Sequence, residues 1–305
     1  MNNLTKISVI MAVYKESKEE LKMSIESILN QTYRNFEYII ILDNPDEEWR
    51  IDFIKSYKYK RIKLFVNKKN MGLVYSLNRG LKNATGDYIA RMDADDISMD
   101  VRFEKQIAFL EENHLDLCGS QFVTFIDKDD IDTIYNPIKS DDINSMLKYG
   151  TCIAHPSWFG KKNIFEKLEG YRDIPACEDY DFLIRAAMNG FMLGNCNEIL
   201  LRYRLSPKSI SRSNPGKQEV IANYVRNKYK KHTHFSMNEF NEYIHSKKYE
   251  KDLKKYNNYL KKVSNVKLSK NLITKFVHCI LLLPNINYVF RRIKVNCIRK
   301  KYITK

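Results

Sequence analysis

Along the first hundred residues, segments with the apolar pattern of strands alternate with segments that have the apolar pattern of helices. Four short runs are apolar and rich in β-branched side chains, as is typical of strands buried on both faces: residues 6–14, 36–43, 61–67 and 87–93. Between the first two runs, Ser17 and Glu20 have the spacing of a capping box, which predicts a helix that continues to about Gln31. A second helix is expected over residues 73–83. This order predicts an α/β fold with a mostly parallel central sheet flanked by helices.

The pattern is less regular after residue 96. Residues 100–113 and 178–189 have helical spacing, whereas three other segments favour extended structure: residues 115–126, residues 150–160 (interrupted by Pro156) and residues 191–206. From residue 217 onward the chain is predicted to be helical and is rich in lysine. The sequence therefore divides into two halves of one domain, residues 1–114 and 115–212, and a basic helical extension over residues 213–305.

The extension contains two segments with apolar faces. Residues 272–283 are apolar, but they are shorter than the roughly 20 residues that a membrane-spanning helix needs. Residues 286–301 combine apolar positions at helical spacing, Ile286, Val289, Phe290 and Ile293, with basic ones, Arg291, Arg292, Lys294, Arg299, Lys300 and Lys301. This pattern is typical of a helix that lies in a membrane surface. A solvated, lysine-rich helical bundle is the alternative.

The positive charge of the chain lies almost entirely in this extension. The net charge is +15, and residues 213–305 alone hold 22 Lys/Arg against 5 Asp/Glu. Residues 1–212 are therefore close to neutral, which argues against a nucleic-acid partner for the folded domain. The six cysteines are scattered singly, so a paired zinc motif is not expected. The first residues lack the pattern of a signal peptide, and a cytoplasmic location is expected.

Polar side chains follow each of the four predicted strands. Ligands of open α/β sheets bind beyond the carboxyl ends of the strands, so these side chains are candidates for one site: Tyr14, Glu16, Asp43, Asn70, Gly72, Asp93, Asp95 and Asp96. Three carboxylates within four residues repel one another unless a cation lies among them, and such oxygen ligands suit Mg²⁺ or Mn²⁺. The alternative is an acidic turn that caps the next helix, with Asp96 or Ser98 as N-cap.

Several of these segments, in this order, resemble a known enzyme family. VIMAVYKE, SIESILNQTY, FEYIIILD, NMGLVYSLNRGL and GDYIARMDADD look like motifs of the inverting glycosyltransferases of family 2, which have a GT-A, Rossmann-like fold. The resemblance covers about residues 5–212 and is greatest to the subgroup that builds bacterial capsule, exopolysaccharide and lipopolysaccharide chains. It implies transfer of a sugar from a nucleotide-diphosphate donor, by default a UDP-sugar, to a hydroxyl of a glycan or lipid-linked acceptor, with a divalent cation as cofactor.

The resemblance implies a nucleotide-sugar site in the half formed by residues 1–114. The residues that would cradle the nucleotide base are Ala12, Val13, Tyr14 and Glu16. Asp43 would recognise the base, although Asn44 and Pro45 stand where the family often has a second acid and a Gly-Ser turn. Asn70 and Gly72 would form a loop that closes over the nucleoside.

The same resemblance implies roles for the acidic motif and for a later arginine. Asp95 would bind the cation directly, Asp93 would face the ribose or the water shell of the metal, and Ala94 would lie against the donor. Arg204 would neutralise phosphate, because the segment that contains it folds over the diphosphate in relatives. Many relatives have a histidine ligand two residues later, where this chain has Ser206. The flanking Arg91 and Arg102 are expected to hold the acidic loop, with contact to phosphate as the alternative.

The second half, residues 115–212, would bind the acceptor and supply the catalytic base. Glu178 and Asp179 match the Glu-Asp pair of the family. The resemblance gives Asp179 the role of taking the proton of the acceptor hydroxyl, and the neighbouring Glu178 would raise its pKa. The alternative is a pair of acids favoured by the helix dipole. His155 would line the acceptor or donor-sugar pocket, with a hydrogen-bonded structural histidine as the alternative.

Two other functional classes fit parts of the sequence. A sugar nucleotidyltransferase has a similar core, but it needs a glycine-rich phosphate loop, and residues 12–17 contain no glycine. A nucleic-acid-binding protein fits the pI of 9.3 but not the near-neutral domain. For a glycosyltransferase, we expect the basic extension to hold the enzyme on the anionic inner face of the membrane, beside a polyprenyl-diphosphate-linked acceptor.

Overall fold

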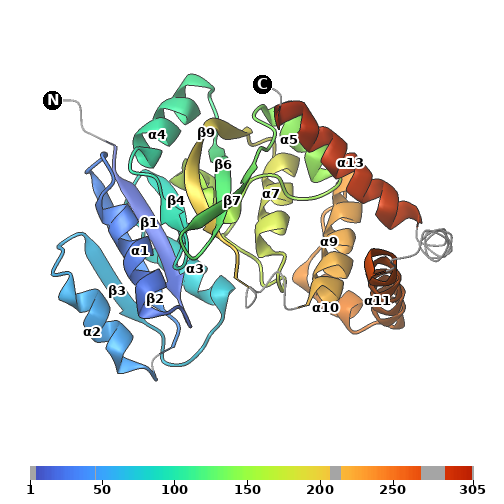
Figure 1. The fold of residues 1–305 in the computed structure, drawn as a ribbon, viewed down its shortest axis with the longest axis horizontal. Coiled ribbons are helices and arrows are strands. Elements are labelled where there is room, and N and C mark those ends of the chain that lie inside the picture. The colour runs from blue at the N-terminus through green and yellow to red at the C-terminus, as the bar shows by residue number, and fades with distance from the viewer. Residues whose placement is uncertain (1–4, 45, 207–213, 269–285, 304–305) are drawn as a thin grey trace.

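The computed structural model describes residues 5–44, 46–206, 214–268 and 286–303, and the apolar segment at 272–283 lies outside these residues. The described residues form a nine-stranded sheet with helices on both faces, extended at one end by further helices (Figure 1). The predicted α/β class, with a mostly parallel sheet followed by C-terminal helices, is confirmed.

The strand order places the first four strands side by side. The order is β3-β2-β1-β4-β8-β6-β9-β5, and β7 pairs with β6. The strands are β1 (Ile7–Val13), β2 (Phe36–Leu42), β3 (Ile62–Val66), β4 (Tyr88–Asp93), β5 (Ile97–Ser98), β6 (Leu117–Ile126), β7 (Asp129–Ile134), β8 (Phe159–Lys161) and β9 (Leu193–Arg204). Because β1 pairs in parallel with β2 and β4, and β2 with β3, the carboxyl ends of these four strands meet at one edge.

The alternation of side chains along the central strands creates two hydrophobic cores. In β1, Val9 and Met11 belong to one core and Ile10 to the other; in β2, Ile40 and Ile41 divide in the same way. Successive strand side chains point to opposite faces, so a continuous apolar run requires a cover on both faces. The sequence pattern therefore explains why helices flank this sheet on two sides.

Seven helices of the described residues flank the sheet. They are α1 (Lys18–Leu29), α2 (Glu48–Ser56), α3 (Leu73–Asn83), α4 (Arg102–Glu112), α5 (Ser140–Leu147), α6 (Lys162–Lys167) and α7 (Glu178–Met188). Helices α1, α2 and α4 bury side chains in the core that contains Val9, whereas α3, α5, α6 and α7 do so in the core that contains Ile10. The predicted capping box of α1 is present: Ser17 Oγ accepts the N–H of Glu20, and the Glu20 carboxylate accepts that of Ser17.

The C-terminal extension is helical, as predicted, and it packs on the second half of the domain. Its described helices are α9 (Pro215–Lys230), α10 (Met237–Ile244), α11 (Lys247–Leu268) and α13 (Ile286–Ile303). Ile221 and Val225 of α9 are buried in the same core as Phe182 and Leu183 of α7, and Figure 1 shows the extension in orange and red beyond α7. No helix among the described residues is both long and apolar enough to cross a bilayer.

The structure differs from the predicted elements mainly in the second half. The strand-like segment at 150–160 contains a short 3₁₀ turn, His155–Ser157, and only its end belongs to β8. Pro156 lies at the start of that turn, since proline has no N–H for a ladder but fits the first position of a helical turn. The pattern also did not indicate α2, α5, α6 or β7. In α2 only Arg50 and Ile54 are buried, too few for a visible period.

Candidate active site at the ends of the parallel strands

The residues predicted after β1 and β2 meet at the carboxyl edge of the sheet. Ala12 lies opposite Asp93 in the register of β1 and β4. The Val13 carbonyl accepts the backbone N–H of Asp43 at 2.8 Å, and Asn44 Nδ2 donates to the Tyr14 carbonyl at 3.4 Å. The ends of the strands therefore form one continuous edge, which is where an α/β sheet binds its ligands.

Of the four residues predicted to cradle the base, Ala12 and Val13 belong to β1, and Tyr14 and Glu16 follow it with partly exposed side chains. Val13 is fully buried and Ala12 packs against buried neighbours. The backbone N–H of Tyr14 donates to Glu16 Oε2 at 2.7 Å, so the segment folds back on itself. Burial raises the pKa of Glu16, and the charge of Asp93 adds to this rise. Glu16 is therefore a further acid beside the turn that follows β4.

Asp43 organises the loop that follows β3. Its Oδ1 accepts the backbone N–H of Met71 at 2.8 Å, and its Oδ2 accepts that of Gly72 at 2.8 Å. The side chain of exposed Asn70 accepts the same Gly72 N–H at 3.0 Å. Gly72 has φ of 89°, which a residue with a Cβ adopts only with strain. The acid predicted to recognise the base thus also shapes the loop predicted to close over it.

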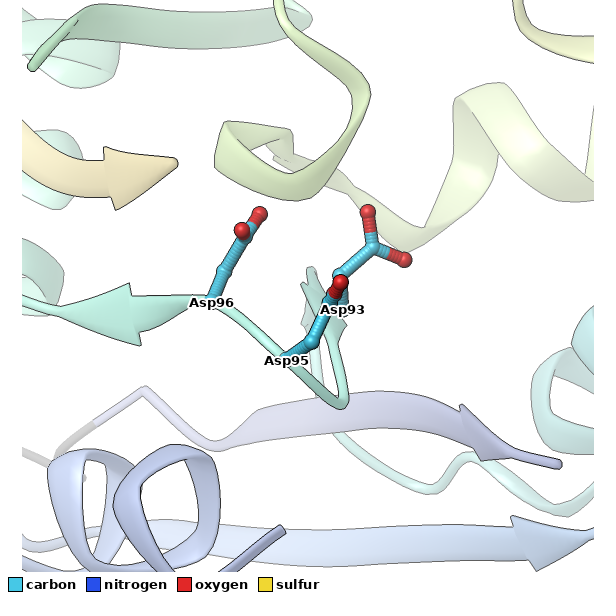
Figure 2. A group of neighbouring side chains, drawn as sticks. All are labelled: Asp93, Asp95 and Asp96. Carbon is cyan, nitrogen blue, oxygen red and sulfur yellow. The ribbon is translucent and has the colours of Figure 1, made fainter. Parts of the chain in front are cut away.

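Three carboxylates cluster on the turn between β4 and β5. One oxygen each from Asp93, Asp95 and Asp96 lie within 4.8 Å of one another. Figure 2 shows the three side chains on one turn, with the carboxylates of Asp93 and Asp96 directed to the same side. Asp93 and Asp95 are partly exposed, whereas Asp96 is 1% exposed. The side chain of Ala94 is buried in the core that contains Val9, which leaves its backbone at the turn.

The cluster holds its negative charge at an energetic cost. Burial, followed by the charges of Asp93, Glu16 and Glu20, raises the pKa of Asp95 to about 7. Burial, Asp93 and Asp95 raise the pKa of Asp96 well above its ordinary value. Asp96 Oδ1 accepts the backbone N–H of Arg204 at 2.7 Å, but Oδ2 has no partner among the described residues. A buried carboxylate oxygen without a partner, next to two more carboxylates, requires a proton or a cation.

This donor set fits a hard divalent cation. Mg²⁺ and Mn²⁺ prefer carboxylate oxygens, and Asp93, Asp95 and Asp96 supply three of them within reach of one ion. Bound there, such an ion would supply positive charge to a diphosphate group. The sequence assigned the metal to Asp93 and Asp95; Asp96 belonged to the same acidic cluster, but its position in the turn between β4 and β5 gave no signal that it would face Asp93.

The acidic turn does not cap a helix. Helix α4 begins at Arg102, its N-cap is Val101, and no side chain caps it. Ser98 lies in β5, where its backbone N–H donates to Ser27 Oγ at 3.0 Å. The alternative interpretation, with Asp96 or Ser98 as N-cap, is therefore wrong, because two strand residues and a loop separate the acids from the helix.

Three arginines lie around the acidic turn between β4 and β5. Arg91 forms an ion pair with Asp93, and Arg102 Nη2 donates to the Arg91 carbonyl at 2.9 Å, so both have the loop-holding positions that were expected. Arg204 Nε donates to the Asp95 carbonyl at 2.8 Å and lies 3.9 Å from the Glu20 carboxylate. Arg204 is thus a neighbour of the acidic turn, and its contacts fix the backbone of that turn.

Glu178 and Asp179 lie at the first turn of α7. Burial raises the pKa of both, and the charge of Asp179 contributes to bringing that of Glu178 to about 7. The Tyr180 N–H, which donates to Asp179 Oδ1 at 2.6 Å, and the charge of Arg91 oppose the rise for Asp179. Near neutral pH Glu178 is therefore close to its own pKa, whereas the Tyr180 N–H and the charge of Arg91 favour the ionised form of Asp179.

His155 is buried against aromatic rings. Its Nε2 lies 2.9 Å from the Tyr171 hydroxyl, and its ring contacts Trp158 edge-on with centroids 4.5 Å apart. Burial, with a smaller effect of Arg91, lowers the pKa of His155 well below its ordinary value. His155 is therefore a neutral, buried side chain with a hydrogen-bond partner. This agrees with the alternative interpretation of His155 as a structural histidine.

Tyr203 is a site residue whose role the sequence pattern left unspecified. Burial raises the pKa of its hydroxyl, and the charges of Asp93, Asp96 and Asp95 raise it further. Its ring contacts Phe122 with centroids 5.6 Å apart. Tyr203 precedes Arg204 in the segment that the resemblance placed over the diphosphate, which is the signal that could have indicated it.

Comparison with known proteins identifies the family. Residues 8–169 match the model of "Glycosyl transferase family 2". An uncharacterised glycosyltransferase, MJ1057, of Methanocaldococcus jannaschii is 37% identical over 239 residues, which are 76% of this chain and 82% of that protein. The O-antigen biosynthesis glycosyltransferase WbnJ of Escherichia coli is 33% identical over 234 residues, 75% of this chain and 91% of that protein. The putative glycosyltransferase EpsE of Bacillus subtilis is 36% identical over 211 residues, 67% of this chain and 74% of that protein.

Solved structures share the fold. The crystal structure of S. aureus TarS 1-349 in complex with UDP-GlcNAc superposes with a TM-score of 0.60 at 17% identity, over 72% of this chain and 65% of that chain. The likeness of arrangement supports the GT-A architecture, with a mostly parallel sheet between layers of helices. With the family model covering more than half of its residues, the chain belongs to glycosyl transferase family 2.

Proposed function

We propose that this protein is an inverting, metal-dependent glycosyltransferase that moves a sugar from a UDP-sugar to a hydroxyl of a glycan or lipid-linked oligosaccharide in bacterial surface polysaccharide synthesis. Family membership supports sugar transfer. The names of WbnJ and EpsE point to polysaccharide synthesis, and the TarS complex supports a UDP-sugar donor. The observation that carries the proposal is the partnerless Oδ2 of buried Asp96 beside Asp93 and Asp95.

The proposed chemistry needs one base on this chain. Asp179 takes the proton of the acceptor hydroxyl while the hydroxyl oxygen attacks the anomeric carbon from the face opposite the nucleoside diphosphate. The bond from that carbon to the diphosphate oxygen breaks, and UDP leaves with the electron pair. A positioned base of this kind contributes roughly 10²–10⁴-fold to the rate. Asp93, Asp95 and Asp96 would hold Mg²⁺ or Mn²⁺, which supplies charge stabilisation to the leaving diphosphate.

The proposal is tested with a panel of nucleotide sugars. UDP-, GDP- and CMP-linked sugars are offered with Mn²⁺, Mg²⁺ or EDTA, and thermal shift and release of the nucleotide (UDP, GDP or CMP) are measured. We expect a UDP-sugar to stabilise the wild type only with metal, and Asp95→Asn to abolish that response. Asp179→Asn should keep donor binding and lose transfer. Metal-independent transfer, or full activity of Asp179→Asn, contradicts the mechanism, and pyrophosphate formation from UTP and a sugar phosphate indicates a nucleotidyltransferase instead.

We further propose that α13 binds the anionic inner face of the membrane and that the enzyme acts there on a polyprenyl-diphosphate-linked acceptor. Phe290 is 61% and Ile293 is 50% exposed, and Lys294, Lys300 and Lys301 are exposed on the same helix. The opposite face packs inward: Val289 lies against the cluster that contains Tyr256 and Tyr259, and Arg291 pairs with Glu219. Exposed apolar side chains among lysines are the pattern of an interfacial helix, and each basic residue adds about 1 kcal/mol near an anionic membrane.

Vesicle flotation tests this surface on the full-length protein. Wild type should float with vesicles that contain anionic phosphatidylglycerol and much less with neutral phosphatidylcholine vesicles. Phe290→Ser combined with Ile293→Ser should reduce flotation without lowering thermal stability. Ile131→Ser is the control, because Ile131 is 56% exposed on β7, outside the extension. Equal flotation of all three proteins contradicts the proposal.

A further inference from the structure

The turn that leads into α7 has an unusual backbone conformation. Ala176, two residues before Glu178, has φ of 55°, in the left-handed region that a residue with a Cβ adopts only with strain. Five other non-glycine residues of the described chain have a positive φ: Lys58, His114, Asp127, Glu169 and His232. Asp127 lies in the hairpin between β6 and β7, and the other four directly follow the C-cap of a helix, where this conformation is common. Of these six residues, only Ala176 lies just before a helix.

The start of α7 depends on this turn for its position. The N-cap of α7 is Cys177, and no side chain forms a hydrogen bond at this cap. The Cys177 N–H donates instead to the Ile174 carbonyl at 3.1 Å, within the turn. A strained backbone conformation persists only where the surrounding structure holds it, so the contacts of the turn determine where α7 begins.

The C-terminal extension contacts the turn at both of its ends. At the end nearer α7, Gln218 Nε2 of α9 donates to the Ala176 carbonyl at 3.1 Å. At the other end, Arg172 Nη1 donates at 2.7 Å to the carbonyl of Phe235, between α9 and α10, and its guanidinium lies 4.1 Å from the centroid of the Phe235 ring. Arg172 also forms an ion pair with Asp181 of α7. Side chains and backbone of the extension therefore hold the segment that precedes the two acids.

We propose that Gln218 is a positioning residue for the acids at the start of α7, because its amide holds the Ala176 carbonyl and so fixes the turn from which α7 begins. This rests on the proposed function, in which Asp179 is the base. Gln218 touches neither substrate and acts through the backbone of the turn. The extension then contributes to sugar transfer as well as to the proposed binding of membranes.

Steady-state kinetics separate this role from general packing. Gln218→Met keeps the length of the side chain and removes the donor, so kcat should fall by up to roughly 100-fold, the effect of a shift of about 1 Å in a catalytic group. The KM for the donor should stay the same, since Gln218 contacts the acceptor half. Gln218→Lys keeps an N–H donor and should recover part of the rate.

Tyr229→Phe is the matched control for these kinetics. It removes a hydroxyl on the same helix that donates to the Asn144 carbonyl of α5 at 3.3 Å, and it should leave kcat unchanged. Unchanged kcat in Gln218→Met, or an equal loss in Tyr229→Phe, overturns the proposal.

Amide hydrogen exchange of the full-length protein tests the hold on the turn without requiring activity. The N–H groups of Cys177 and Asp181 donate to the Ile174 and Cys177 carbonyls, and opening of the turn would release both. In Gln218→Met they should exchange roughly 2- to 10-fold faster, the effect of one lost hydrogen bond on a local opening, whereas Tyr229→Phe should match wild type. Wild-type exchange in Gln218→Met overturns the proposal. If the wild type transfers no sugar from any donor, the proposed function fails, and exchange still decides whether Gln218 fixes the turn.

Discussion

The backbone N–H of Gly72 donates to Asp43 Oδ2 at 2.8 Å, so the acid that ends β2 fixes the loop that follows β3. Met71 donates to the other oxygen of the same carboxylate. Two adjacent backbone N–H groups thus converge on one side chain, and the conformation of Gly72 depends on it. A substitution at Asp43 should therefore alter the conformation of the loop as well as any contact with a ligand.

Replacing Asp43 with Asn should weaken donor binding. The amide puts one N–H₂ group against a backbone N–H, and hydrogen bonds to charged groups contribute about 1.5–3 kcal/mol, or roughly tenfold or more in affinity. We expect a higher KM for the UDP-sugar with a smaller change in kcat. Asp46→Asn is the control, because Asp46 is exposed. An unchanged KM would show that the loop holds its shape without this carboxylate.

Asp96→Asn should have opposite effects on metal affinity and on metal-free stability. The substitution removes a buried charge whose Oδ2 has no partner among the described residues, so the metal-free protein should melt at a higher temperature. Mn²⁺ affinity should fall roughly 10–100-fold. Calorimetric titration and thermal melts in EDTA measure the two effects. Asp100→Asn, at an exposed position, should change neither; unchanged Mn²⁺ affinity in Asp96→Asn would exclude this acid from the cation site.

Glu178 should make stability fall as pH rises toward neutral. Its pKa is raised from 4.5 to about 7 in the folded protein, so between these values the folded state binds more protons than the unfolded state, and the free energy of unfolding decreases with pH. Glu178→Gln mimics the protonated form. Its melting temperature should match that of wild type at pH 4.5 and exceed it at pH 8. Glu166→Gln, with a carboxylate 60% exposed, is the control; a constant difference across this range would contradict the assignment.

Glu178 should also determine how the rate of sugar transfer depends on pH. At saturating Mn²⁺, ionisation of Glu178 near pH 7 makes Asp179 a stronger base, so wild-type kcat should rise through this pH. Glu178→Gln should lack that rise, whereas Glu166→Gln should retain it. Steady-state rates from pH 5.5 to 8.5 provide the measurement, and a rise of equal size in Glu178→Gln would assign it to another group.

Gly86→Ala should destabilise the entry to β4. A Cβ at Gly86 would lie 2.7 Å from the Lys6 carbonyl oxygen and 2.7 Å from the Ser8 nitrogen, and backbone atoms cannot move aside as side chains do. Overpacking of this kind costs about 1–3 kcal/mol, which urea unfolding can resolve. Gly150→Ala is the control, since nothing lies within 4 Å of its Cβ position. An equal midpoint for the two variants would contradict the close approach.

Much of the first half of the fold follows from local pattern. β1, β2 and β4 are buried apolar runs, β3 is a partly buried run at the edge of the sheet, and α1 carries both members of its capping box. Few chain topologies are compatible with parallel strands joined by helices. The sequence could therefore predict that these strands end at the same edge of the sheet. The assembly of Asp43, Gly72 and Asp93 at one edge follows from that topology.

The rest depends on contacts that no local pattern encodes. Asp96 faces Asp93 because the turn after β4 is tight, and its backbone partner, Arg204, comes from β9, 108 residues away. The raised pKa of Glu178 depends on burial and on the charge of Asp179, and the buried charge of Arg91 opposes the rise for both acids. Pro156 ended the predicted strand at 150–160, but the side on which His155 would pack was set by Trp158 and Tyr171.

The packing of α9 on α7 has a consequence for how this chain can be divided. Ile221 and Val225 cover side chains of α7, the helix that begins with Glu178 and Asp179, yet they lie beyond the matched family region, which ends at residue 169. A protein cut near residue 212 would expose that apolar surface to water and would aggregate before it could report on membranes or catalysis. The extension therefore covers an apolar surface of α7, and a chimera should exchange it together with α7.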